Sequence, residues 1–463
     1  MKADPAARTP LPAGARWLLA AMSGVLGLVV LDETVVGVAL PTIQADLGLG
    51  NGGGHWVVNA YLLAFTCSVA LAGRLGDLLG RERLFLAGLA LFGLASLGAG
   101  AAPDGVALIA ARAVQGVGAA CLFPAAFAIL TATFPPDRRG AALGAQTMAA
   151  GLFMAAGPLV GGLFAEHLSW RWIFWINLPV VALIGGIVLA VWRAGAGPLA
   201  TAPAPRPPGG FDWGGLPLLV GGLTALTLAL MQAGDRGWGA VPVLALLAGG
   251  SAALAAFVRR EARRPQPLVD TGLLRIPAFA GGVLVFFMFQ FDKIVVFVFL
   301  PLYLQQGLGY APVQAGLPVM IAILPTLLTS LLAGRAADRF GSRRPAVAGL
   351  LLNGGALLPL AGATLTGSYP LILAALLVWG AMLPFIAVVA RRALMGAVPA
   401  DARGQASGVN LTVQMMGGTI GLAACSTLLA QTGSFLPVFL LTGLLVLAMA
   451  PVCWLTLDRP SGG

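Results

Sequence analysis

Three acidic residues lie well inside long apolar stretches of the chain. They are Asp32, Glu33 and Asp292, the last of which is followed directly by Lys293. A charge at the centre of a membrane-spanning helix costs about 2.5–3.5 kcal/mol on insertion scales, so it needs a partner, a water-filled cavity or a proton. A carboxyl group in this setting can take up and release a proton. We therefore predict that these acids carry protons.

A basic residue, Arg112, lies about two helical turns inside another apolar stretch, and Gln115 follows nearly one turn later. A guanidinium group keeps its proton, so Arg112 can hold a carboxylate within the membrane. The other interpretation is that its side chain extends outward to the membrane surface. The predicted proton-coupling residues are Asp32, Glu33, Arg112, Asp292 and Lys293.

The geometry of a helix limits how these residues can pair. Adjacent residues point about 100° apart, so Asp32 and Glu33 cannot face one direction, nor can Asp292 and Lys293. Two arrangements stay open for Lys293: an ion pair with Glu33 or Asp32, or a pair with Asp292 alone or an extended side chain. Asp32 lies nine residues before Pro41, or about 13 Å of helix, which predicts a position in the central cavity.

The elements that position these residues are membrane-spanning helices. The chain has 463 residues, 59% of them hydrophobic and 10% charged, with a mean hydropathy of +0.92. Windows of about 20 residues divide it into spans. We predict an all-α polytopic membrane protein with fourteen spans, at 17–40, 56–74, 84–102, 106–132, 141–165, 172–192, 213–233, 239–258, 279–304, 313–334, 345–365, 370–395, 405–430 and 435–457.

The positive charges predict the orientation of these spans. Of the 27 Lys and Arg, all but four fall in alternate loops and at the two ends of the chain; the exceptions are Arg171, Arg236, Arg112 and Lys293. Such clustering marks the cytoplasmic side, so both termini are predicted to be cytoplasmic. The net charge of +10 is then a signal of topology, and no nucleic-acid partner is expected.

Two halves of the chain follow one plan. Segments from the first half match segments from the second at offsets of 260 to 264 residues: Asp32–Pro41 with Asp292–Pro301, Gly73–Arg83 with Gly334–Arg344, and Asp137–Gln146 with Asp401–Asn410. Such repeats predict two six-helix bundles with a substrate site between them. The predicted parts are a bundle at 1–193, a cytoplasmic linker at 194–210, two extra helices at 211–260 and a second bundle at 261–463.

Four motifs carry a resemblance to a known family. They are LDETVVGVALP from Leu31, GRLGDLLGRERL from Gly73, RAVQGVGAA from Arg112 and GLFMAAGPLVGG from Gly151. The chain resembles the fourteen-span drug:proton antiporters of the major facilitator superfamily. That resemblance implies a monomeric exporter of small amphipathic or cationic compounds in a bacterial inner membrane. It also implies that the proton gradient drives export. No other cofactor, no metal and no enzymatic activity are expected.

The loop motif and the Gly-rich motif have mechanical roles in this interpretation. The loop is predicted to be a cytoplasmic gate between the bundles, made of Gly73, Arg74, Asp77, Gly80, Arg81, Arg83, Arg335 and Asp338. A plain topology loop is the alternative. The Gly-rich motif is predicted to be a close contact along which helices rock, with Gly151, Gly157, Pro158, Gly161 and Gly162; generic packing is the alternative.

Polar residues within spans are candidates for contact with substrate. They are Gln115, Gln146, Gln290, Asn410 and Gln414. The motifs leave the substrate open: a single natural product, or a lipid moved between leaflets, would need the same fold. An enzyme is disfavoured because the sequence has neither a nucleophile elbow nor a phosphate-binding loop.

Overall fold

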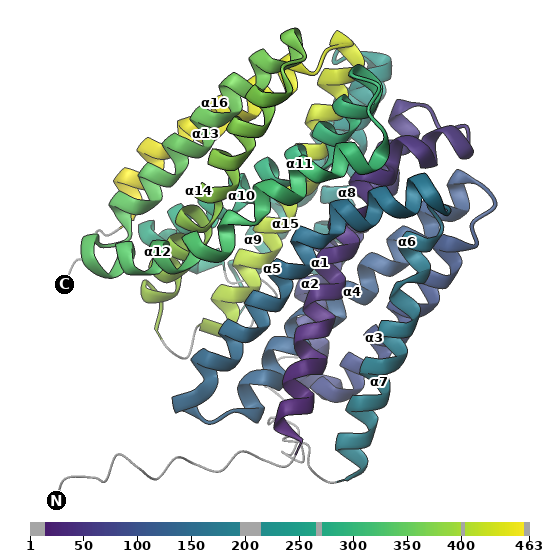
Figure 1. The fold of residues 1–463 in the computed structure, drawn as a ribbon. Helices are drawn as coiled ribbons and strands as arrows, with labels where there is room; N and C mark the ends of the chain where they lie inside the picture. The colour runs from purple at the N-terminus through teal and green to yellow at the C-terminus, as the bar shows by residue number, and fades with distance from the viewer. Residues whose placement is uncertain (1–13, 195–213, 265–270, 400–402, 458–463) are drawn as a thin grey trace, which may run out of the picture.

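The computed structural model describes residues 14–194, 214–264, 271–399 and 403–457. These residues form long helices packed side by side (Figure 1). The predicted linker 194–210 lies almost wholly outside the described residues. We call the side on which the first helix begins the predicted cytoplasmic side, and the opposite side the predicted outer side.

The first bundle consists of α1 to α7. Their bounds are α1 Ala15–Asp46, α2 Asn51–Leu79, α3 Arg81–Gly100, α4 Gly105–Thr133, α5 Pro136–His167, α6 Trp172–Trp175 and α7 Asn177–Arg193. Within this bundle α1 packs along α5, and α4 packs along both α2 and α3.

The second bundle consists of α10 to α16. Their bounds are α10 Pro277–Leu302, α11 Pro312–Ile323, α12 Pro325–Phe340, α13 Arg343–Thr366, α14 Tyr369–Gly396, α15 Arg403–Thr432 and α16 Leu436–Thr456, with two short turns, η1 Thr271–Arg275 and η2 Tyr303–Gly307. Here α10 packs along α15 as α1 does along α5, and α13 packs along α14 as α3 does along α4.

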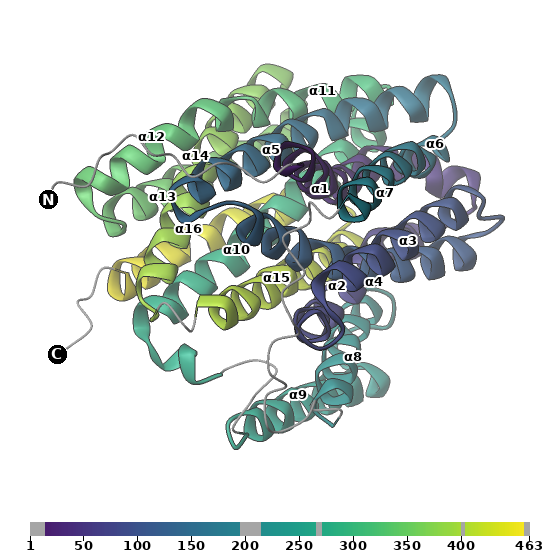
Figure 2. The ribbon, with the colours of Figure 1, turned by 90° about the horizontal axis from the view of Figure 1, so that it is seen from below.

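Two further helices, α8 Gly215–Arg236 and α9 Val241–Glu261, lie together on one side of the molecule (Figure 2). α8 contacts both bundles, because Asn59 Nδ2 lies 3.2 Å from Met231 Sδ and Gln431 Nε2 donates to the carbonyl of Ala233 at 3.0 Å. The helices therefore cover the seam where α2 and α15 meet.

Thirteen helical segments of the described residues are long and apolar enough to cross a membrane. The remaining predicted span, 56–74, falls inside α2, a continuous helix of 29 residues that is not among the thirteen. The count of fourteen stays a prediction. One predicted span, 313–334, is two helices, because Pro325 lacks the N–H that would continue α11 into α12.

Candidate functional site

Asp32 lies at the centre of a polar cluster inside the first bundle. Arg112 Nη1 approaches its Oδ2 at 2.5 Å, and Gln115 Nε2 donates to its Oδ1 at 2.8 Å. Asn177 Nδ2 from α7 adds a contact of 3.3 Å. All four side chains are buried. A charge-assisted contact of this kind stabilises the ionised carboxylate and the guanidinium together.

Arg112 is held on its other sides as well. Its Nε donates to the carbonyl of Val57 at 3.1 Å, and its guanidinium lies 4.4 Å from the centre of the Tyr61 ring. This contact is a cation–π interaction. The side chain therefore points into the bundle, and the alternative in which it extends to the membrane surface is not realised.

Glu33 points in a different direction from Asp32 and joins the two bundles. Lys293 Nζ from α10 lies 3.0 Å from its Oε1, and Gln290 Nε2 donates to the same oxygen at 2.6 Å. The side chains of Glu33 and Lys293 are 9% and 8% exposed, so the ion pair is largely withdrawn from solvent. Of the pairings open to Lys293, the one formed is the contact with Glu33.

The position predicted for Asp32 was wrong in one respect. Its recorded partners all lie on α4 and α7 of its own bundle, so it occupies the bundle interior and not the central cavity. Gln115, predicted to contact substrate, belongs to the same interior cluster.

Of the other polar candidates, one lies beside the Glu33–Lys293 contact and another lies within the first bundle. Gln414 Nε2 from α15 reaches Gln290 Oε1 at 3.4 Å and so extends the polar chain from Glu33. Gln146 Nε2 donates to the carbonyl of Met22 at 3.2 Å within the first bundle. Asn410 is buried, and its Oδ1 accepts no hydrogen bond.

Asp292 has a different partner from Lys293, its neighbour in the sequence. Both of its carboxyl oxygens lie 2.9 Å from Nε1 of Trp379 on α14, inside the second bundle. Sequence reasoning missed Trp379. The signal was the repeat, since Trp379 follows Gln115, the donor to Asp32, at an offset of 264.

The predicted gate residues are only partly described. Gly80 and its repeat mate Gly341 both have positive φ values, 93° and 73°, which glycine adopts without strain. The side chains of Arg74 and Asp77 lie outside the described part. Asp338 forms an ion pair with Arg392 of α14, within its own bundle. The contact across the bundles that was predicted for a gate is therefore not formed by Asp338 here.

The remaining gate residues are Gly73, Arg81, Arg83 and Arg335. Arg81, Arg83 and Arg335 are exposed, and nothing lies within 4 Å of a Cβ built on Gly73.

The glycines of α5 allow two close helix contacts. A Cβ on Gly157 would collide with Thr34, and one on Gly161 with the carbonyl of Val35, so these glycines fit α5 against α1. On another face, a Cβ on Gly162 would lie 2.8 Å from the Pro312 carbonyl oxygen of α11. The motif thus forms a close contact with α11 at this point, while the predicted rocking of the helices along it stays a prediction.

Pro158 and Gly151 differ in how closely they are packed. The Pro158 carbonyl occupies the space that a side chain on Gly316 of α11 would need. A Cβ on Gly151 would meet only Leu327, at 3.8 Å. The tight part of the motif is therefore its half toward the predicted outer side.

Several contacts between the two bundles lie on the predicted outer side. There, Gln305 Nε2 donates to the carbonyl of Val38 at 2.8 Å, His55 stacks edge-on against Phe299, and Glu166 Oε2 accepts from the backbone N–H of Val313 at 3.0 Å. On the predicted cytoplasmic side, α5 scarcely touches α12, and the two helices run apart (Figure 1). Where α5 faces α11 and α12, the bundles are therefore in contact on the predicted outer side and separated on the predicted cytoplasmic side.

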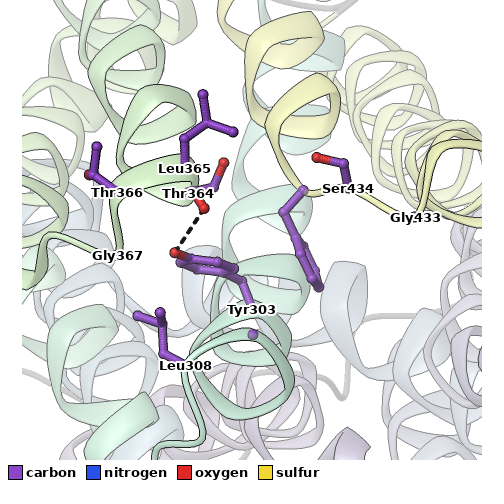
Figure 3. Close-up of a pocket in the computed structure, with 10 residues that line it drawn as sticks. Tyr303, Leu308, Thr364, Leu365, Thr366, Gly367, Gly433 and Ser434 are labelled. Carbon is purple, nitrogen blue, oxygen red and sulfur yellow. Dashed lines mark hydrogen bonds between the residues drawn. The ribbon is translucent and has the colours of Figure 1, made fainter.

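A depression of about 450 Å³ lies elsewhere, at the predicted outer end of the second bundle. Figure 3 shows that Tyr303, Thr364, Gly367 and Ser434 surround it, with the Tyr303 hydroxyl 3.3 Å from the Thr364 carbonyl. None of its lining residues belongs to the polar clusters described above.

Comparison with known proteins identifies relatives that match most of the chain. The sequence model of the "Major Facilitator Superfamily" matches residues 22–280 and 282–463. The "Tetracenomycin C resistance and export protein" of Streptomyces glaucescens is 33% identical over 417 residues, which are 89% of this chain and 76% of that protein. The "Multidrug resistance protein Stp" of Mycobacterium tuberculosis is 32% identical over 406 residues, which are 88% and 74%.

Solved structures show the same fold. A peptide transporter bound to sulfate superposes with a TM-score of 0.70 at 18% identity, over 97% of this chain and 96% of that one.

Proposed function

The chain belongs to the major facilitator superfamily, and we propose that it exports small amphipathic compounds across the bacterial inner membrane in exchange for protons. The family and the relatives are those of membrane transporters. The relatives named for resistance and export support efflux as the direction of transport.

The observation that carries the coupling is the Glu33–Lys293 ion pair between the bundles. A proton on Glu33 removes one of the two charges, and a buried ion pair that loses one charge loses most of its attraction. Protonation therefore weakens a contact that holds α1 against α10. The bundles can then change their relative tilt, which is how transporters of this construction alternate access.

The Asp32–Arg112 cluster has a different part in this mechanism. It lies inside one bundle, so its ionisation fixes α1 against α4 and α7 and not one bundle against the other. We assign to it the relay of a proton between water and Glu33, which is the next residue on α1. The state described here, closed on the predicted outer side with Glu33 paired, is the one that receives substrate from the cytoplasm.

A growth assay tests the function. A bacterium that lacks its own drug pumps, producing this chain, is exposed to a panel of amphipathic cations and neutral compounds. We expect protection against several of them, and loss of that protection with Asp32→Asn at an equal membrane level. Equal protection by Asp32→Asn would contradict the assignment of Asp32.

One relative is named for a single compound and another for many drugs, so a dedicated exporter of one natural product is the second candidate. Protection confined to one compound of the panel would favour it. Lipid transfer between leaflets, with no protection, is a third outcome.

A further inference from the structure

The two halves of the molecule place a carboxyl group in equivalent frameworks. Asp32 and Asp292 are repeat mates, and α4 and α14 correspond at an offset of 264. The structure supports this register. A Cβ added to Gly116 would collide with the carbonyl oxygen of Tyr61, and a Cβ added to Gly380 would collide in the same way with the carbonyl oxygen of Ala322. Gln115 and Trp379 therefore occupy equivalent positions, and each donates to the aspartate of its half.

The two frameworks differ in charge. In the first half, Arg112 neutralises Asp32. The equivalent position in the second half is Leu376, which is buried and apolar. Among the described residues no ion pair to Asp292 is recorded, although its side chain is only 1% exposed. An ionised carboxylate in such a place would carry the full cost of an uncompensated charge in the membrane.

Among the described residues, the elements packed against α10 bring no unpaired Lys or Arg to the level of Asp292. His55 of α2 stacks on Phe299, which lies seven residues further along α10, or about 10 Å of helix. Its neighbour Lys293 binds Glu33 of α1, and Asp32 of α1 binds Arg112. α11 and α16 contain no charged residue, and η2 contains only Tyr303 as a titratable group. The arginines of α14, α15 and η1 lie at the predicted cytoplasmic ends of these elements: Arg391, Arg392, Arg403 and Arg275. Arg391 is twelve residues from Trp379, or about 18 Å of helix.

Few donors surround Asp292, and none of them is charged. Its two oxygens lie 2.9 Å from the single indole N–H of Trp379, and the side chain of Asn353 is its second neutral partner. Asn353 of α13 donates from Nδ2 to the carbonyl of Trp379 at 3.1 Å, and its buried Oδ1 accepts no hydrogen bond from the part of the chain that the structure describes. A neutral carboxylic acid has one O–H to donate, whereas a carboxylate only accepts. A proton on Asp292 would supply the cluster with a donor.

We propose that Asp292 is a proton-binding site separate from the Glu33–Lys293 pair, that it holds its proton in this state, and that Trp379 is its positioning residue. With Asp292 neutral, the charges buried in the middle of the bundles balance, since Asp32 and Glu33 match Arg112 and Lys293. A role of this proton in export rests on the proposed function; its presence on Asp292 does not.

Infrared spectroscopy of the purified protein in lipid tests the site without any transport assay. The C=O stretch of a protonated carboxylic acid is separate from that of a carboxylate. At neutral pH we expect a protonated-acid band that Asp292→Asn removes and that Asp32→Asn and Glu33→Gln retain. A wild-type spectrum without this band, or a band unchanged by Asp292→Asn, would overturn the proposal.

Trp379→Phe provides a second, independent variant, because it keeps an aromatic ring and removes only the indole N–H. We expect the Asp292 band to move to higher frequency, as it does when a carbonyl loses a hydrogen bond. An unmoved band would overturn the positioning role of Trp379.

Thermal unfolding gives a further check. Asp292→Asn mimics the neutral acid and should unfold near the wild-type temperature, whereas Asp32→Asn leaves Arg112 unpaired and should unfold at a lower one. Equal losses of stability in the two variants would contradict a neutral Asp292.

The link to transport has its own readout. If the proton on Asp292 is exchanged in each cycle, Asp292→Asn should lower the number of protons moved per substrate, measured from the gradient at which net flux reverses. A protein with the band but no proton-driven export would refute the proposed function and leave the protonated site intact.

Discussion

Asp32 and Glu33 are neighbours in the sequence, and their carboxyl groups serve different contacts. The angle of about 100° between adjacent helical residues directs Asp32 toward α4 and Glu33 toward α10. The helical angle alone predicted that the two side chains must diverge. It could not predict which of them would reach Lys293, because that depends on how α1 is rotated against α10 in the packed molecule.

The Glu33–Lys293 pair can be tested by a double-mutant cycle. Lys293→Met leaves the buried charge of Glu33 without its cationic partner and should destabilise the protein by about 3 kcal/mol. Adding Glu33→Gln removes the remaining charge and should restore much of that loss, since residues in contact are not additive. Thermal unfolding and transport rate of the single and double variants are the measurements. Strict additivity would mean that Lys293 has another partner.

The contact between Trp379 and Asp292 was not predicted from the sequence. A tryptophan in an apolar span is a common packing residue, and only its place in the repeat, opposite Asp292, gives it chemical meaning. The repeat was found from charged and glycine motifs, and α14 shares with the α4 motif only Val378 and Gly380, without the charge of Arg112. The equivalence of Gln115 and Trp379 follows from the structure, because each donates a hydrogen bond to the aspartate of its own bundle.

At the scale of elements, most spans were predictable because apolar length alone determines them in a membrane. What hydropathy does not record is a break within a span. The predicted span 313–334 contains Pro325, and the structure divides it there into α11 and α12. Nor could hydropathy place the two extra helices; the contacts of α8 with α2 and α15 give their position.

The contact between α5 and α11 gives a prediction about the bundles. Gly316→Val adds a side chain where the Pro158 carbonyl lies, and overpacking of this kind costs about 1–3 kcal/mol. We expect the predicted outer halves of the bundles to separate, which should lengthen the distance between spin labels on α5 and α11. Gly355→Val is the matched control, because nothing lies within 4 Å of a Cβ there. Equal label distances in both variants would argue against this contact as the closure.

At the scale of the whole molecule, the two bundles are in one of at least two arrangements that alternating access requires. The gate motif was predicted from sequence to form a contact between the two bundles. The sequence alone does not show in which arrangement of the bundles this contact forms. In the described state α12 and the predicted cytoplasmic half of α5 run apart. Asp338 then binds Arg392 of its own bundle.

A gate that forms only in the other arrangement gives a further prediction. Spin labels at Leu79 and Phe340, both exposed at helix ends, should come closer when substrate and an acidic exterior favour the outward-facing state. Asp77→Asn should reduce the short-distance population in a background without the four native cysteines. An unchanged distance distribution in Asp77→Asn would count against a gate at this loop.

The most direct test of the account is export driven by a proton gradient alone. The purified protein is reconstituted in liposomes with a fluorescent amphipathic cation, and a pH difference is imposed across the membrane with no other energy source. We predict that the cation moves against its own gradient as protons move the opposite way, that an ionophore abolishes this movement, and that Asp32→Asn shows none. Equal flux with and without the pH difference would contradict proton-coupled exchange.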